Sequence, residues 1–266
     1  MATLQSANIT VMIKAARKAA GKLKRDYGEV DQLQVSTKGP ADFVTVADTR
    51  TEEMLRESLS FARRDYGFLM EESGAVTGED PTRRWIIDPI DGTTNFIHGI
   101  PHFAISIALE ENGEITAGVI YEPVNDQMFW AEKGNGAWLN DRRMRVSGRV
   151  QMNEAIFATG IPFLGRGKHE PFLKQMGAVM AVSAGIRRFG SAALDLAYVA
   201  AGRFDGFWET DLQPWDIAAG IIMVREAGGM ISEVNGGDQM LKTGSVLASN
   251  PNLFSELAQT IKKASK

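Results

Sequence analysis

A short apolar run that ends in two aspartates constrains this chain more than any other segment. Residues 85–87 are Trp-Ile-Ile, and they lead into Asp88 and Asp91, which are three positions apart. Pro89 stiffens the step between the two acids because its ring fixes φ and removes an N–H. Gly92 then permits a tight turn. The pattern predicts a buried strand whose two carboxylates converge on one point.

The residues after this turn predict the start of a helix. Thr93, Thr94 and Asn95 favour helix initiation, and the free N–H groups of a first helical turn attract anions. Two neighbouring carboxylates repel each other unless a cation lies between them. Acids beside anion-binding amides therefore indicate a divalent metal that holds a phosphate. The alternative is an ordinary turn, since Asp, Pro, Gly and Thr all form turns.

Three further acids occur where an expected element begins or ends. Glu71 follows the apolar run 67–70. Asp216 lies near Pro214 at an expected helix start, and Asp48 has the same position in another helix. Sites in open α/β sheets form at the carboxyl ends of strands, so we expect these acids to add to the site. Simple N-capping is the alternative for the two helix-start aspartates, and one side chain can cap and ligate at once.

Composition restricts any metal site to mostly oxygen ligands. The chain of 266 residues has no Cys and three His, which excludes disulfides, thiolate catalysis, zinc fingers and iron–sulfur clusters. A formal net charge of −4 argues against non-specific nucleic-acid binding as the main activity. Hard cations remain, namely Mg²⁺, Mn²⁺ or Ca²⁺. The acid-alternating loop of a Ca²⁺ site is absent, so the scattered acids favour Mg²⁺.

Short strand-like and helix-like segments are mixed along the whole chain, which predicts an α/β or α+β fold. The expected helices cover residues 7–25, 48–62, 169–181, 191–202, 215–227 and 251–264. The expected strands cover residues 67–70, 85–87, 103–123 as a hairpin, 127–139, 144–147, 155–159, 186–189, 204–208, 230–234 and 246–249. Residues 30–47 are expected to be a loop, with a break at Lys38-Gly39-Pro40.

A shift in composition near residues 147–155 suggests two subdomains. Residues 1–150 would form an N-terminal α+β subdomain that carries the metal and phosphate site. Residues 151–266 would form a C-terminal α/β subdomain that completes the substrate site. Because no Pro, Gly or Ser linker marks the boundary, we expect an extensive interface between the two.

The basic N-terminal segment has two interpretations. Residues 1–25 carry six Lys or Arg side chains among alanines, as transit peptides and membrane-surface helices do. The helical spacing of apolar residues from Ile9 to Leu23 instead favours an amphipathic helix packed on the protein. No stretch approaches the roughly 20 apolar residues of a membrane span. We therefore expect a soluble, cytoplasmic protein with no membrane partner.

Three motifs together resemble the inositol monophosphatase family, in particular its bacterial members. They are EES at 71–73, DPIDGTTNFIHG at 88–99, and WDIAAG at 215–220 running on to EAGG at 226–229. The resemblance covers nearly the whole chain. It implies a layered α-β-α-β-α sandwich of the sugar-phosphatase type and a homodimer. It also implies lithium-sensitive, Mg²⁺-dependent hydrolysis of a phosphate monoester, with two or three ions.

The same resemblance assigns metal and catalytic roles to individual residues. The first metal would be held by Glu71, Asp88 and the carbonyl of Ile90, and the second by Asp88, Asp91 and Asp216. The implied catalytic residues are Glu71, Thr93 and Asp91, with Glu71 and Thr93 orienting the attacking water. Asp48 matches an acid near a further, weaker metal.

Substrate contacts are implied in the same way. The amides of Gly92 and Thr93 would bind phosphate oxygens. The positions that match contacts to the hydroxyl groups of a sugar or inositol are Asp91, Gly190, Ser191, Ala192, Glu209 and Asp216. His98 and His102 are expected to be structural or solvent-facing.

The function that best fits these observations is an inositol-1-monophosphatase that releases myo-inositol and phosphate by attack of a metal-activated water. A related sugar or polyol phosphatase, similar to fructose-bisphosphatase or histidinol-phosphatase, is the nearest alternative. A regulatory protein that binds RNA or transcription machinery is a different class. Its hints are the basic N-terminal helix and Arg187-Arg188, which a surface or dimer-interface cation pair explains equally well. The complete set of acids argues against an inactive binding module.

Overall fold

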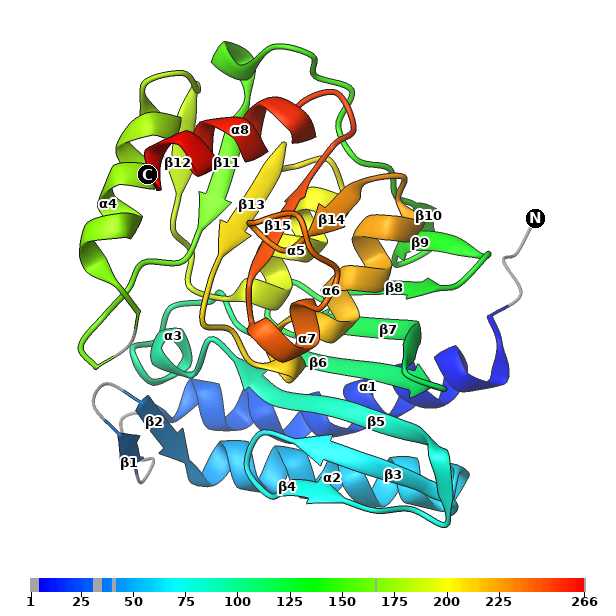
Figure 1. Ribbon diagram of the computed structural model, residues 1–266. Helices are drawn as coiled ribbons and strands as arrows, with labels where there is room; N and C mark the ends of the chain where they lie inside the picture. Colours follow the sequence, from blue (N-terminus) through cyan, green and yellow to red (C-terminus); the bar gives the residue numbers. More distant parts are fainter. Residues whose placement is uncertain (1–4, 31–34, 40–41, 166, 266) are drawn as a thin grey trace.

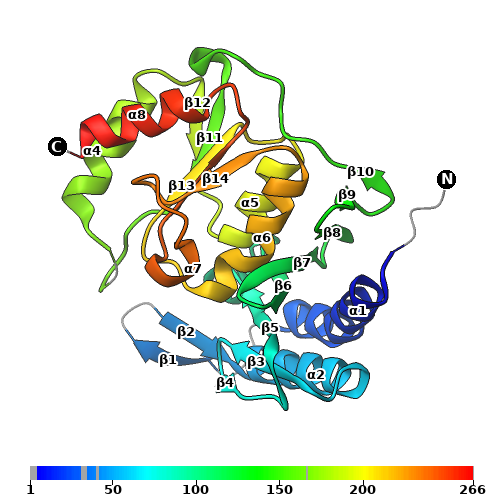
Figure 2. The same ribbon diagram turned by 45° about the vertical axis from the view of Figure 1, so that its right-hand side comes forward.

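Two β-sheets and three layers of helices stack in the order α-β-α-β-α (Figure 1; Figure 2). This computed structural model describes residues 5–30, 35–39, 42–165 and 167–265. The helical layers, from one outer face to the other, are α1 (Ala7–Gly28) with α2 (Val46–Ala62), α5 (Ala192–Ala200) with α6 (Pro214–Glu226), and α4 (His169–Met180) with α8 (Phe254–Ala264). The predicted sandwich is confirmed.

The larger sheet has eight strands in the order β10-β9-β8-β7-β6-β5-β3-β4. Their bounds are β3 (Tyr66–Met70), β4 (Gly74–Val76), β5 (Asp80–Asp91), β6 (Ala104–Glu111), β7 (Glu114–Glu122), β8 (Gln127–Glu132), β9 (Gly136–Leu139) and β10 (Arg142–Arg143). The pair β3–β5 is parallel and the other neighbours are antiparallel. The predicted hairpin at 103–123 is confirmed as β6–β7.

The smaller sheet has five strands in the order β12-β11-β13-β15-β14. Their bounds are β11 (Ile156–Thr159), β12 (Gly185–Arg187), β13 (Gly206–Glu209), β14 (Met230–Ser232) and β15 (Val246–Ser249). Strand β11 runs parallel to both β12 and β13. The remaining elements are the hairpin of β1 (Val35–Gly39) and β2 (Asp42–Thr45), a 3₁₀ turn (Met152–Glu154), α3 (Thr93–Ile97) and α7 (Met240–Thr243).

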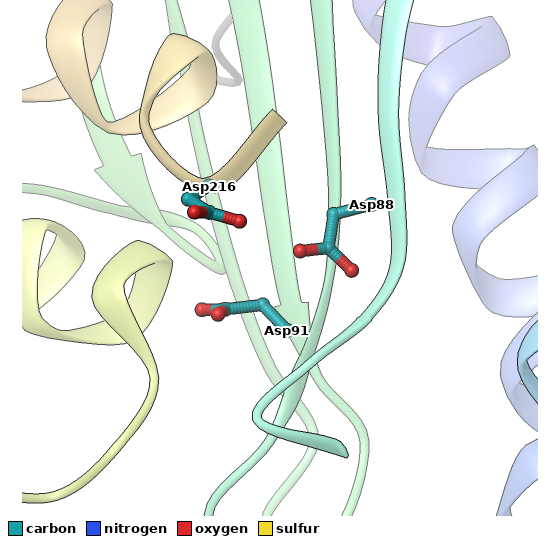
Figure 3. A group of neighbouring side chains, drawn as sticks. All are labelled: Asp88, Asp91 and Asp216. Atoms are coloured by element: carbon teal, nitrogen blue, oxygen red, sulfur yellow. The ribbon is translucent and has the colours of Figure 1, made fainter. Parts of the chain in front are cut away.

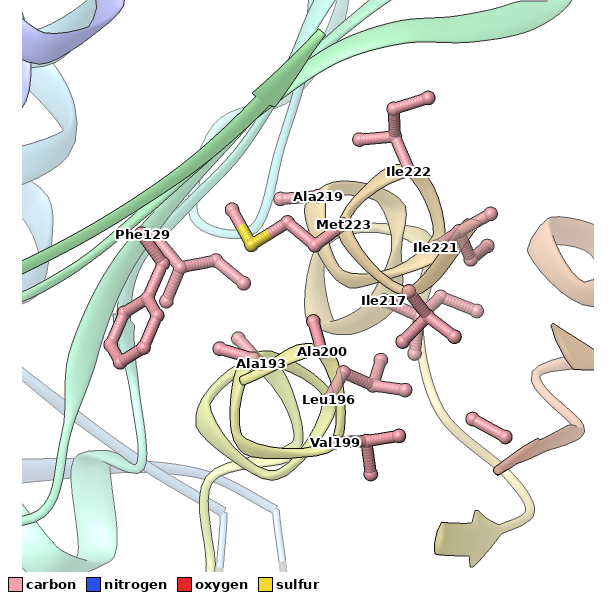
Figure 4. Close-up of a cluster of buried hydrophobic side chains, with 14 of the residues drawn as sticks. Phe129, Ala193, Leu196, Val199, Ala200, Ile217, Ala219, Ile221, Ile222 and Met223 are labelled. Carbon is pink, nitrogen blue, oxygen red and sulfur yellow. The ribbon is translucent and has the colours of Figure 1, made fainter. Parts of the chain in front are cut away.

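Side-chain alternation in β5 explains why its apolar run is continuous. Trp85 and Ile87 pack with α1 and α2, whereas Ile86 packs on the opposite face in the core of α5 and α6. All three are at most 1% exposed. A strand covered by helices on both faces needs apolar residues at every position. Figure 4 shows the inner core, where Met223 of α6 extends toward the sheet that carries Phe129.

Helix α6 lies unusually close to the larger sheet at Gly118 of β7. A Cβ atom at Gly118 would lie 2.9 Å from both Cα and O of Ala219 and 2.8 Å from Cγ2 of Ile222. The absence of a side chain at this position therefore sets the distance between α6 and the sheet. Because α6 carries Asp216 in its first turn, this packing also helps to place an acid of the predicted site.

Two predicted segments are wrong. Residues 30–47 contain the β1–β2 hairpin where a loop was expected, although Pro40 lies outside the described residues. Residues 144–147 form no strand, because successive backbone groups bond different elements. The N–H of Met144 donates to Ala137 and that of Val146 donates to Ala227. Neither feature follows from the local hydrophobic pattern.

The predicted division at residue 150 falls between the two sheets, which occupy residues 66–143 and 156–249. The inner core contains residues from both sides of residue 150, including Phe129 and Phe207. The division into two subdomains stays a prediction. Within the part of the chain that the structure describes, no helix has the length and apolar character to cross a bilayer.

The close packing at Gly118 gives a test of the fold. We expect Gly118→Ala to lower the free energy of unfolding by about 1–3 kcal/mol, because the added methyl group overlaps α6. Gly177→Ala is the matched control, since a Cβ at Gly177 in α4 meets nothing within 4 Å. That change should raise stability by about 0.5–1 kcal/mol. Urea denaturation measures both, and an equal effect of the two variants would contradict the packing argument.

Candidate active site

A pocket of about 150 Å³ opens where β3, β5 and β13 end and where α3, α5 and α6 begin. Apart from Asp48, the residues predicted to act in catalysis, metal binding or substrate binding line it: Glu71, Asp88, Ile90, Asp91, Gly92, Thr93, Gly190, Ser191, Ala192, Glu209 and Asp216. These residues come from both halves of the chain. The pocket unites them, while their individual chemical roles stay predictions.

Glu71 and Asp88 meet because β3 and β5 are parallel. The register pairs Met70 with Ile87, so the next residue of each strand lies at the same edge of the sheet. The N–H of Glu71 donates to the carbonyl of Ile87 at 3.2 Å and continues the ladder. The two carboxyl groups are close enough to share a hydrogen bond.

A bulge brings Asp91 to the same side as Asp88. In a regular strand, residues three positions apart point to opposite faces. Here Asp88 pairs with Ser106 and Asp91 pairs with Ala104, so β5 has one residue more than β6 over this step. Pro89 lies within the bulge, where a missing N–H is tolerated. The bulge is the physical basis of the predicted convergence.

Asp216 completes the acidic group from the first turn of α6. One carboxylate oxygen from each of Asp88, Asp91 and Asp216 can be chosen so that all three lie within 4.8 Å of one another (Figure 3). The side chain of Asp216 also accepts from the N–H of Gln213 at 2.8 Å, so it belongs to a capping box while it lines the pocket. Capping and ligation are compatible at this position, as the sequence suggested.

Hydrogen bonds from α5 hold Asp91. Its Oδ2 accepts from the hydroxyl of Ser191 and from the N–H of Ala193, the latter at 2.8 Å. These bonds join residues about a hundred positions apart in the chain and fix α5 against the end of β5. Asp91 thus lines the pocket with its carboxylate oriented by the start of α5.

The electrostatics of the acidic group favour a bound cation. Burial raises the pKa of Asp88 well above its usual value, and the charges of Glu71, Asp91 and Asp216 raise it further. Burial also raises the pKa of Asp91 to about 6, although the bonds from Ser191 and Ala193 oppose the change. A divalent cation would remove this repulsion, and the donors are all oxygen atoms. The residues therefore fit a metal ion.

Gly92 and Thr93 form the tight turn predicted to bind phosphate. Gly92 has a φ of 95°, and a Cβ there would lie 3.1 Å from the carbonyl oxygen of His102 and 3.2 Å from that of Gly190. The hydroxyl of Thr93 lies 3.0 Å from the carbonyl oxygen of Ile90 and 3.3 Å from Oδ1 of Asp48. Only glycine fits this turn without strain.

The position of Asp48 corrects one prediction. Thr45, not Asp48, is the N-cap of α2, and Asp48 is the third helical residue of a capping box. Its Oδ2 accepts from the N–H and the hydroxyl of Thr45 at 2.8 and 2.6 Å. Asp48 is fully buried and reaches the site through Thr93.

Gly190, Ala192 and Glu209 also line the pocket. The Glu209 carboxylate lies directly over Gly160, where a Cβ would fall 1.9 Å from Oε1. Asp195 of α5 lines the pocket too and is 1% exposed. Burial raises its pKa well above the usual value, and the charges of Glu209 and Asp91 add to that effect.

Sequence reasoning missed one residue that supports the site. Glu52 of α2 is 2% exposed, and its carboxylate accepts from the N–H groups of Glu72 and Ser73 at 2.8 and 3.0 Å. It also accepts from the hydroxyl of Ser73. These bonds hold the turn that directly follows Glu71. A Glu at this position in an amphipathic helix carries no local signal of such a role.

The two histidines near the acidic motif have the predicted minor roles. His98 is exposed and its Nδ1 lies 2.8 Å from the carbonyl oxygen of Thr94. His102 packs against Phe189 and Tyr198, and burial lowers its pKa to about 4. Neither is among the described residues that line the pocket.

The sequence matches the family model of the inositol monophosphatase family over residues 5–266. The chain belongs to this family. An inositol-1-monophosphatase of Mesorhizobium japonicum is 56% identical over 259 residues, which cover 97% of each chain. The crystal structure of the extragenic suppressor protein suhB of Bartonella henselae has a TM-score of 0.95 and 55% identity, and the match covers 97% of this chain and 99% of that one.

A further relative has a different kind of name. The Nus factor SuhB of Escherichia coli is 41% identical over 263 residues, which cover 96% of this chain and 98% of that one. The family therefore includes full-length relatives named for a phosphatase activity and others named as a Nus factor.

Loss of Glu52 should weaken cation binding without removing any predicted ligand. We expect Glu52→Ala to reduce Mg²⁺ affinity about 10- to 100-fold, because the backbone amides of Glu72 and Ser73 lose their acceptor and the turn that follows Glu71 loosens. Glu52→Gln keeps one acceptor oxygen and should lose less. Calorimetric titration with Mg²⁺ measures both. Glu53→Ala is the control on the same helix, since the side chain of Glu53 is 64% exposed. If Glu53→Ala lowered Mg²⁺ affinity as much as Glu52→Ala, the role assigned to Glu52 would be contradicted.

The raised carboxyl pKa values predict that Mg²⁺ binding releases protons. The Asp91 carboxyl, with a pKa of about 6, holds a proton below that pH, and the pKa of Asp88 is raised as well, so a cation must displace protons and its affinity should rise as the pH increases through about 6. Without a cation, the stability of the folded protein should change with pH in the opposite direction. Because the pKa of Asp91 is raised in the folded state, its contribution to folding stability is lost as the pH rises from 3.8 toward 6.

Titration at pH 6 in two buffers of different ionisation enthalpy measures the proton release. Identical binding enthalpies in the two buffers would show that no proton leaves and would contradict the prediction.

Proposed function

We propose that the chain is a Mg²⁺-dependent phosphatase that hydrolyses a phosphate monoester, with inositol 1-phosphate as the substrate and myo-inositol and phosphate as the products. The observation that carries the proposal is the group of Asp88, Asp91 and Asp216 beside the turn at Gly92 and Thr93. Family membership and the names of relatives at 53–56% identity support it.

Five residues would hold two metal ions. Glu71, Asp88 and the carbonyl of Ile90 would bind one ion, and Asp88, Asp91 and Asp216 would bind the other. Bound divalent ions supply charge neutralisation on the phosphate and a water of lowered pKa. A third, weaker ion near Asp48 completes the proposal of two or three ions.

The chain's own groups position the other reactants. The amides of Gly92 and Thr93 would bind phosphate oxygens, and Glu71 with the hydroxyl of Thr93 would orient the attacking water. The contacts of Thr93 with Ile90 and Asp48 support that role because they restrict its hydroxyl. No covalent nucleophile is needed, in agreement with a chain that has no Cys.

The remaining pocket residues would bind the alcohol part of the substrate. They are Asp91, Gly190, Ser191, Ala192, Glu209 and Asp216. Carboxylates and backbone groups accept from and donate to hydroxyls, so this end of the pocket suits a polyol. A sugar or polyol phosphatase similar to fructose-bisphosphatase or histidinol-phosphatase is the alternative that uses the same chemistry.

A regulatory role with transcription machinery or RNA is the second candidate. The 41% identity to Nus factor SuhB is the observation that favours it. A homodimer, inhibition by lithium and a cytoplasmic location stay predictions that extend the proposal.

A substrate panel with a metal-ligand variant tests the function. The panel contains inositol 1-phosphate, fructose 1,6-bisphosphate and histidinol phosphate. Phosphate release should require Mg²⁺ and should be fastest for inositol 1-phosphate. In Asp88→Asn the rate should fall about 100-fold or more. Asp141→Asn, an exposed site away from the pocket, is the control. Inositol phosphates as the poorest substrates would exclude the inositol assignment, and full activity of Asp88→Asn would exclude the metal site.

The same variant distinguishes the regulatory role from the catalytic role. If catalysis is the physiological role, Asp88→Asn should fail to restore growth to a deletion strain that the parent gene restores. Full rescue by Asp88→Asn would instead support the regulatory role.

A further inference from the structure

Arg188 is a positive charge in an otherwise acidic pocket. Among the described residues that line the pocket, it is the one with a cationic side chain, while six carboxyl residues line the same space: Glu71, Asp88, Asp91, Asp195, Glu209 and Asp216. The sequence pattern was interpreted as a surface or dimer-interface cation pair. The structure places Arg188 at the pocket and its neighbour Arg187 outside the pocket lining.

The guanidinium lies over Gly190, one of the residues proposed to contact the alcohol part of the substrate. A Cβ at Gly190 would fall 2.5 Å from Nη1 of Arg188 and 3.4 Å from its Cζ, so the head group rests on the backbone of Gly190. The Arg188 charge also opposes the rise in the pKa of Asp195, which lines the same pocket. Both observations place the head group at the pocket.

Gly190 separates Arg188 from the turn that would bind the scissile phosphate. The carbonyl oxygen of Gly190 lies 3.2 Å from the position that a Cβ of Gly92 would occupy. The Arg188 head group lies against the Cα of Gly190. The guanidinium therefore lies on Gly190, next to residues that are proposed to contact the alcohol part of the substrate.

The side chain of Arg188 makes no hydrogen bond or ion pair with any residue in the described ranges. By contrast, Arg187 donates to the carbonyl of Ile186 at 3.1 Å. A guanidinium offers five N–H donors in a planar arrangement that matches a carboxylate or phosphate. Its donors are therefore available to a ligand.

We propose that Arg188 can bind a second anionic group on the alcohol part of a substrate, so that the pocket accepts, besides inositol 1-phosphate, phosphate monoesters of polyols that also carry a carboxylate or another phosphate. The inference rests on the proposed phosphatase function and specifies its substrate class. Arg188 determines specificity here and takes no part in the chemical step.

Two substrates that differ by a single charge test this role. Glycerol 2-phosphate and 2-phosphoglycerate have the same reacting ester, but one hydroxymethyl group of the former is a carboxylate in the latter. With the full chain and Mg²⁺, we expect Arg188→Gln to lower kcat/KM for 2-phosphoglycerate about 10-fold or more relative to glycerol 2-phosphate, mainly through KM. Arg188→Lys keeps the charge and should restore part of the loss.

Arg187→Gln is the matched control, because it removes the same charge outside the pocket lining and should leave the ratio of the two substrates unchanged. An equal loss on both substrates in Arg188→Gln would overturn the proposal and would indicate a contact with the scissile phosphate. An equal loss with a changed oligomeric state in size-exclusion chromatography would overturn it in favour of a subunit contact.

The two proposals fail in different ways. If the parent enzyme releases phosphate from glycerol 2-phosphate but not from 2-phosphoglycerate, the role of Arg188 is wrong and the phosphatase function stands. If the parent enzyme releases phosphate from no ester of either assay, the phosphatase function itself is wrong, and the inference built on it fails with it.

Discussion

Like charges held close together in a buried site dominate the physics of this protein. Asp88 and Asp91 are 2% and 8% exposed, and their oxygens can lie within 4.8 Å of each other and of Asp216. Such a group is unstable in ionised form unless a cation or protons neutralise it. The surrounding fold must therefore hold each acid in place against repulsion, and a bound ion would turn this unfavourable group into a binding site.

The scaffold meets this need with hydrogen bonds from elements that are distant in sequence. Helix α5 holds one oxygen of Asp91, and the backbone at Gln213 holds one oxygen of Asp216. Glu52 holds the turn after Glu71, and Asp48 reaches Thr93. The first two bonds fix pocket carboxylates directly, whereas Glu52 and Asp48 act on residues next to or within the pocket lining. The stacked layers place these supports around the site, since α2, α5 and α6 cover the two faces of the larger sheet.

The distribution of charge divides the pocket into two ends. The acidic end, at the bulge of β5 and the first turn of α6, suits metal ions and the phosphate they neutralise. The other end adds the positive charge of Arg188 near Glu209 and Asp195. A mixed end of this kind can discriminate between alcohols by charge, because a guanidinium favours an anion and nearby carboxyls bind hydroxyls. The positive charge and the acidic group thus lie in the same pocket.

Much of the site could be predicted because its residues lie at the ends of local patterns. Asp88, Asp91 and Gly92 follow an apolar run, and Asp216 follows a helix-starting Pro, so each has a signal within a few residues of itself. The hairpin β1–β2 and the support from Glu52 have no such signal. They depend on pairing and contacts between segments, which the local pattern does not encode.

The sequence by itself determined the chemistry: oxygen ligands, a chain without thiols, strands that end in acids and a glycine turn for an anion. Only the tertiary structure decided the geometry. The parallel pairing of β3 with β5 places Glu71 beside Asp88, the bulge turns Asp91 to the same side, and the packing of α6 on Gly118 brings Asp216 to them. The reason is that residue type sets what a side chain can bind, whereas the distance between side chains far apart in sequence is set by how the layers pack.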